Sequence, residues 1–124
     1  MAVDISSEWV RRIGEVGFLA AGHGQVEAAH RIFDGLVAIR PDSEYPWIGK
    51  AIAELQVGRE TEALRLLRDE AIKRNPHSPE AQVFVGLALK RAGRGSEAEA
   101  TLQAVSKAHP EQAAGQMAKA FLEP

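Results

Sequence analysis

The chain has 124 residues, 45% of them hydrophobic and 26% charged, and a formal net charge of −2. These values suit one folded domain over residues 1–124 and exclude the basic surface that nucleic-acid binding requires. The first residues do not resemble a secretory signal and no apolar run could span a bilayer, so we expect a cytoplasmic protein with no nucleic-acid partner and no membrane insertion.

Five kinds of residue recur along the chain with a period of 34 to 35 residues. In each period a small residue is followed by a glycine, an alanine, a large apolar residue and a proline, at nearly constant spacing. In that order the three sets are Gly17, Gly24, Ala29, Phe33 and Pro41; Ala51, Gly58, Ala63, Leu67 and Pro76; and Gly86, Gly93, Ala98, Leu102 and Pro110.

Each period predicts two closely packed antiparallel helices. Small residues let the helices cross closely, the glycine provides the left-handed turn that ends the first helix, and the proline cannot continue the second. Ser43 and Ser78 are candidate N-caps, and Pro79 suits a first helical position. In chain order we expect helices at about 7–22, 25–39, 44–57, 60–74, 79–92, 96–108 and 111–122.

The second period contains one extra residue. Leu67 and Pro76 are nine positions apart, whereas the corresponding spacing is eight in the other two periods. We place the extra residue near Asp69–Ala71 and expect the helix to absorb it locally.

This pattern, with Trp47 at an aromatic position early in the second period, resembles the tetratricopeptide repeat over nearly the whole chain. The resemblance implies an all-α, right-handed α-solenoid of three helix-turn-helix repeats at about 7–43, 44–78 and 79–110. The amphipathic segment 111–122 resembles the capping helix that covers the last apolar face of such arrays. The departures from the family pattern are Ile13 and Gln82 in place of tryptophan, and Ala20, Glu54 and Leu89 in place of tyrosine.

The first helices of tetratricopeptide repeats line a concave groove, so the resemblance also implies a binding surface. In the third period this helix is apolar nearly all round, which indicates burial on more than one side. We expect the groove to hold an apolar or amphipathic segment of a protein or peptide, with the charged residues at its rim. The candidate groove residues are Arg11, Phe18, Tyr45, Ile48, Ile52, Leu55, Val83, Leu87 and Lys90, with Gly14, Ala21 and Glu80 completing the wall.

No constellation of residues indicates catalysis or a metal. The four histidines lack the spacing that places two ligands on one helix face, the chain has no cysteine, and no serine has an evident neighbouring base. We therefore expect a protein that is not an enzyme and needs neither a metal nor a cofactor. The lysine–asparagine clamp of family members that bind heat-shock chaperone tails is also missing, because its positions are Gly14, Phe18, Gly49, Glu80 and Phe84.

Among small three-repeat proteins, the chain is similar in architecture to the chaperones of bacterial type III secretion systems that sequester needle or translocator subunits. That similarity implies a cytoplasmic chaperone that masks an apolar segment of its client. A scaffold or a self-associating assembly protein stays open as the alternative, as does pairing into a homodimer or heterodimer. It is also open whether the apolar wall merely completes the core or is covered by the chain's own termini.

Overall fold

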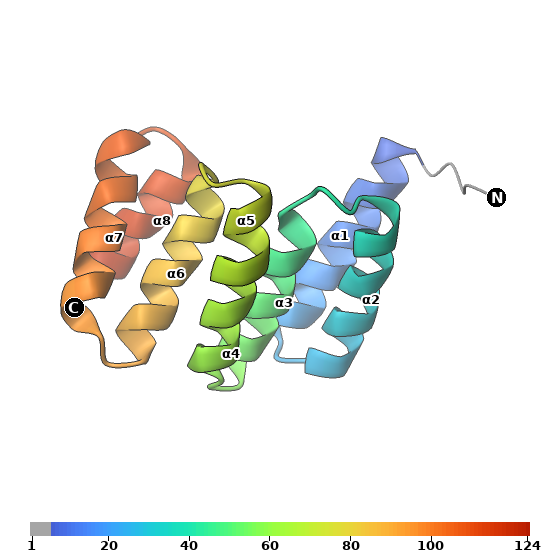
Figure 1. Cartoon of the computed structure of the whole chain (residues 1–124), viewed down its shortest axis with the longest axis horizontal. Helices are drawn as coiled ribbons and strands as arrows, with labels where there is room; N and C mark the ends of the chain where they lie inside the picture. The colour runs from blue at the N-terminus through green and yellow to red at the C-terminus, as the bar shows by residue number, and fades with distance from the viewer. Residues whose placement is uncertain (1–5) are drawn as a thin grey trace.

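The computed structural model describes residues 6–124, and within this range the chain forms helices and turns only. Successive helices stack in antiparallel pairs along the long axis, from α1 and α2 at one end to α7 and α8 at the other (Figure 1). The predicted all-α solenoid of three helix pairs and a capping helix is confirmed. The elements are α1 (Ser7–Gly22), α2 (Val26–Ile39), α3 (Tyr45–Gln56), α4 (Glu60–Arg65), η1 (Leu66–Ala71), α5 (Ile72–Arg74), α6 (Pro79–Arg91), α7 (Gly95–Ala108) and α8 (Ala113–Leu122).

The repeated glycines make the turn inside each helix pair. Gly24, Gly58 and Gly93 have φ values of 70°, 78° and 80°, in the left-handed region where a side chain would be strained. The residue after each glycine donates its amide hydrogen to the carbonyl five positions earlier, as in a Schellman motif. The three turns are therefore built alike, as the spacing predicted.

The repeated small residues lie where helices cross. A Cβ atom on Gly17 would lie 2.8 Å from the ring of Phe33, and one on Gly86 would lie 2.5 Å from Leu102. Phe33 and Leu102 are buried in the core. The small residue and the large apolar residue of one repeat are thus direct packing partners.

The extra residue of the second repeat is held in a π-helical segment. α4, η1 and α5 follow one another without a break and form one helix, with η1 covering Leu66–Ala71. The hydrogen bonds of a π-helix span five residues instead of four, so a π-helical segment absorbs one extra residue without breaking the helix. The prediction of a local adjustment near Asp69–Ala71 is confirmed.

The two candidate N-caps differ. The Ser78 side chain accepts a hydrogen bond from the Ala81 amide at 3.1 Å and caps α6 as predicted. α3 instead begins after Glu44, and the Ser43 hydroxyl accepts from the Tyr45 amide at 3.2 Å. The boundary differs because Ser43 stabilises the turn before the helix rather than its first residues.

Glu54 is a buried carboxylate that joins the first two repeats. It lies 2.9 Å from Nε2 of His30 on α2 and accepts a hydrogen bond from Arg59 at 3.2 Å. Burial of a charged group costs free energy unless partners surround it, and these two supply that compensation. At this position the family usually has tyrosine, so the chain replaces an aromatic contact with a polar one.

Three apolar clusters follow one another along the array. Phe18 and Ile52 pack against the cluster around Phe33 and also against the central cluster around Leu67. These two residues therefore connect the first two repeats. In the third cluster, Ala114 and Ala118 of α8 pack with Val83 of α6. α8 therefore covers the last apolar face, as expected of a capping helix.

Candidate peptide-binding groove

Three predicted groove residues are buried and do not face a groove. Ile48, Leu55 and Val83 have 2%, 3% and 0% of their surface exposed. Ile48 and Leu55 belong to the cluster formed with α4 and η1, while Val83 is covered by α8. Their expected placement was wrong, because the family positions do not reveal how far each helix is rotated into the core.

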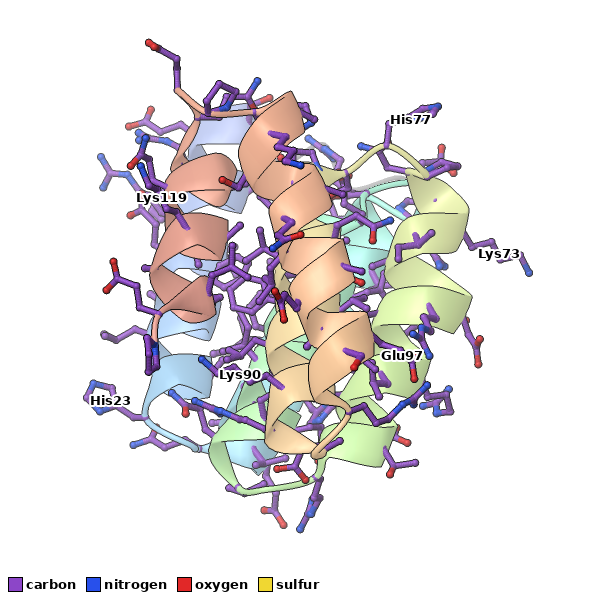
Figure 2. All side chains as sticks on the ribbon, turned by 90° about the vertical axis from the view of Figure 1, so that its left-hand side faces the viewer. His23, Lys73, His77, Lys90, Glu97 and Lys119 are labelled. Atoms are coloured by element: carbon purple, nitrogen blue, oxygen red, sulfur yellow. The ribbon has the colours of Figure 1, made fainter. Side chains whose placement is uncertain are left out.

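Lys90 is exposed but already has partners within the chain. Its Nζ donates hydrogen bonds to the carbonyl oxygens of Phe121 at 2.6 Å and Glu123 at 3.0 Å, at the end of α8. Figure 2, viewed from the α7 and α8 end, shows Lys90 beside these helices. A cation at a helix C-terminus is favourable because the carbonyl groups there carry partial negative charge. Lys90 therefore stabilises the C-terminal end of the capping helix and is not a free cation at the rim of the groove.

The other five of the nine candidates stay at least partly accessible, whereas Ala21, which was expected to complete the wall, is fully buried. Arg11 and Tyr45 are exposed, and Phe18, Ile52 and Leu87 are partly buried against the core clusters. α8 covers the third repeat at Val83, so the accessible part of the predicted wall belongs mainly to α1 and α3. We call these five residues the open wall.

A pocket of about 280 Å³ lies at the α1 end of the open wall. It brings together Arg11, Phe18 and Tyr45, which sequence reasoning had placed on one surface. Arg40 also lines it, and its guanidinium donates to the Ile39 carbonyl. The full lining is Val10, Arg11, Gly14, Glu15, Phe18, Phe33, Leu36, Arg40, Ser43, Tyr45 and Pro46.

Aromatic and aliphatic side chains form the floor of this pocket. Phe33 is fully buried, and the ring of Phe18 meets it edge to face, with centroids 5.0 Å apart at 69°. Gly14 contributes no side chain, and a Cβ there would approach only Leu36, at 3.9 Å. Sequence reasoning missed Val10, Leu36 and Pro46 as lining residues, because apolar residues at core positions give no sign that a space is left beside them.

The mouth of the pocket carries polar groups. Arg11 is loosely paired with Glu15 at 3.8 Å, and its side chain is 69% exposed. Burial raises the pKa of the Tyr45 phenol, and the negative charges of Glu80 and Glu44 raise it further. Tyr45 therefore stays neutral and keeps its hydroxyl hydrogen available for donation at physiological pH.

A second apolar surface lies on α1, outside the predicted groove. Trp9, Val16 and Leu19 are 61%, 57% and 64% exposed. On a helix with 3.6 residues per turn these positions share one flank. We call these three residues the α1 flank.

Residues 6–124 contain neither a metal-binding cluster nor a membrane-spanning helix. No group of three or more histidine, cysteine, aspartate or glutamate side chains could hold a metal there. Figure 2 shows His23 and His77 on opposite sides of the molecule. Within the same range no helix has the length and hydropathy needed to cross a membrane.

Solved structures with a similar fold include secretion chaperones. The type III secretion translocator chaperone SycD of Yersinia enterocolitica superposes with a TM-score of 0.76 at 17% identity, covering 95% of this chain and 90% of that one. SycD in complex with a peptide of the translocator YopD gives 0.68 at 17% identity, covering 96% of each chain. The OM64 tetratricopeptide domain of Arabidopsis gives 0.71 at 18% identity, covering 93% and 94%.

Sequence comparison identifies the repeat itself. No curated protein sequence matches the chain significantly. A family profile of the tetratricopeptide repeat matches residues 58–122, which are 65 of the 124 residues. The chain belongs to the tetratricopeptide repeat family.

Proposed function

We propose that the protein binds an apolar or amphipathic segment of another polypeptide along the open wall, as a small cytoplasmic chaperone of the type III secretion kind. The observation that carries this proposal is the accessible apolar surface formed by Phe18, Ile52 and Leu87, next to a pocket lined by apolar side chains. Accessible apolar patches on small proteins commonly mark interaction sites.

The size of the surface is adequate for specific but reversible binding. Complete burial of one large apolar side chain contributes about 1.5–3 kcal/mol. Phe18, Ile52 and Leu87 are already partly buried, so each can contribute only part of this amount. Association also costs several kcal/mol of lost translational and rotational freedom. Three or four anchors therefore bind a short segment only weakly, and a longer client that covers more of the surface binds more tightly.

The solved structures with a similar fold support the proposed chaperone function. SycD is a translocator chaperone, and one of its structures contains a peptide of the translocator YopD. A chaperone role also accounts for an apolar wall that is left accessible, because a client covers the wall until delivery.

The proposal is tested with a fluorescein-labelled, 18-residue amphipathic peptide whose apolar face carries leucine and phenylalanine. Ile52→Glu combined with Leu87→Glu places two charges on the open wall. We expect this change to weaken binding at least about tenfold, because both anchors are lost and charge is buried instead. Fluorescence anisotropy gives the dissociation constants.

The matched control is Ala100→Glu combined with Ala104→Glu, two exposed positions on α7. Both double variants must keep the helical circular dichroism spectrum of the wild type. Equal affinity of the wild type and the Ile52/Leu87 variant would rule out the open wall as the binding surface.

The α1 flank favours a second candidate function, self-association. Trp9, Val16 and Leu19 lie on the first helix of the array, and three exposed large apolar residues on one flank suit contact with a second helix. Val16→Glu with Leu19→Glu should convert any dimer to a monomer in sedimentation velocity. A wild-type protein that is monomeric at 100 µM would exclude this candidate.

A further inference from the structure

The volume of the pocket at the α1 end of the open wall limits what it can hold. It measures about 280 Å³. An engineered apolar cavity of about 150 Å³ binds benzene, whereas sites for drug-sized molecules have about 300–1,000 Å³. The pocket is therefore large enough for one aromatic side chain.

The floor of the pocket favours an aromatic occupant over an aliphatic one. Phe33 is fully buried and held against Gly17, so it does not contact an occupant itself but fixes the position of the Phe18 ring beside it. Phe18 already meets that ring edge to face. A third ring that enters beside Phe18 can adopt the same edge-to-face or an offset geometry, which adds attraction beyond the burial of surface.

The mouth of the pocket favours a negative charge next to that ring. The guanidinium of Arg11 is mostly exposed, and its 3.8 Å contact with Glu15 is the longest ion pair among the described residues. A contact of this length in solvent is weak, so Arg11 is free to turn to a carboxylate that arrives with a ligand. Glu44 and Glu80 place negative charge near Tyr45, so Arg11 is the residue that attracts the acidic group.

From these observations we infer that the pocket recognises one aromatic side chain of the bound polypeptide together with an adjacent acidic side chain, which Arg11 holds. The inference rests on the proposed function and names the feature that selects the client. Phe18 packs against the aromatic ring, and Arg11 pairs with the acidic side chain.

Gly14 offers a way to close the pocket without disturbing the fold. A Cβ at this position meets only Leu36, at ordinary contact distance, so a longer side chain can extend into the open space. Gly14→Leu should therefore fill the pocket. Gly35→Leu is the matched control, because Gly35 lies on α2 outside the pocket and a Cβ there meets nothing within 4 Å.

The ligands for the test are three dipeptides, N-acetyl-Asp-Phe-amide, N-acetyl-Asn-Phe-amide and N-acetyl-Asp-Ala-amide. They are titrated into the ¹⁵N-labelled full-length protein and followed by NMR. We expect the Asp-Phe dipeptide to shift the amide signals of Gly14, Phe18 and Tyr45 saturably, and the Asp-Ala dipeptide to bind at least about tenfold more weakly. Replacing aspartate with asparagine should weaken binding about two- to fivefold.

Two variants, each with a matched control, assign these effects to the pocket. Gly14→Leu should abolish binding of the Asp-Phe dipeptide, while Gly35→Leu should retain it. Arg11→Gln should remove the preference for aspartate over asparagine. Arg12→Gln, one position along the helix and outside the pocket, should leave that preference intact.

Several outcomes would overturn the inference. These are shifts that map away from the pocket, equal binding of the phenylalanine and alanine dipeptides, or unchanged binding by Gly14→Leu. Binding that appears only after Ile5→Asp would instead identify the chain's own first residues as the occupant, and binding that falls as protein concentration rises would identify a second copy. If Gly14→Leu still captures the 18-residue amphipathic peptide at wild-type affinity, the pocket inference fails while the proposed function stands.

Discussion

Two glycines on one helix provide a sharp test of the packing. Gly14 and Gly17 both lie within α1, but a Cβ on Gly17 would meet Phe33 at 2.8 and 2.9 Å and Ile32 at 3.0 Å. A Cβ on Gly14 would meet only Leu36, at 3.9 Å. Replacing either glycine with alanine therefore gains the same helix propensity, but only Gly14 has space for the added methyl group.

The expected magnitudes follow from these distances. Glycine to alanine inside a helix raises the free energy of unfolding by about 1 kcal/mol. Overpacking a well-filled core lowers it by about 1–3 kcal/mol. We therefore expect Gly14→Ala to be about 1 kcal/mol more stable than wild type. Gly17→Ala should be up to about 2 kcal/mol less stable, because Phe33 is enclosed and cannot move aside.

Urea denaturation followed by far-ultraviolet circular dichroism measures both values. The wild type and the two variants must give the same dependence on urea concentration, so that the midpoints report stability alone. Equal stabilisation by both alanines would contradict the close crossing of α1 and α2 at Gly17.

Three further predictions concern polar contacts. Lys90→Met should free the last turn of α8, lower its local stability by about 1 kcal/mol and speed amide hydrogen exchange there. Glu54→Ala should lower the free energy of unfolding by about 1–3 kcal/mol in urea, because His30 loses its buried partner, and Glu54→Gln should cost less. Tyr45 is the chain's one tyrosine, so phenolate absorbance should show its pKa above the ordinary value and a lower pKa in Glu80→Gln. The raised pKa stabilises the fold below the ordinary tyrosine pKa, and this contribution should disappear as pH rises through the folded-state pKa.

Much of the fold was predictable because local chemistry determines it. Gly24, Gly58 and Gly93 each occupy a left-handed turn that few other residues can adopt, so their spacing gives the lengths of the helix pairs. The extra residue of the second repeat was likewise visible as a shift in spacing, although its form as a π-helical segment depends on the packing around Leu66 and Leu67.

The candidate site was less predictable because it depends on tertiary contacts. Transferring family positions placed Leu55 and Val83 on the surface, but the rotation of α3 and the position of α8 bury them. The role of Lys90 was also hidden, since its partners are backbone carbonyls 31 and 33 residues away. The pocket beside Phe18 exists because Gly14 leaves a space, and a glycine in a sequence indicates small size without indicating what surrounds it.

Photo-crosslinking at one position tests the central claim most directly. The photoreactive amino acid p-benzoylphenylalanine replaces Tyr45 on the open wall and, as a control, Lys73, which points away from the array in Figure 2. In cells that make the protein, our account predicts a crosslinked polypeptide from position 45 and none from position 73, and the crosslink should be lost when Ile52→Glu and Leu87→Glu are added. Crosslinks from position 73 alone, or a position-45 crosslink that survives both glutamates, would contradict client binding along the open wall.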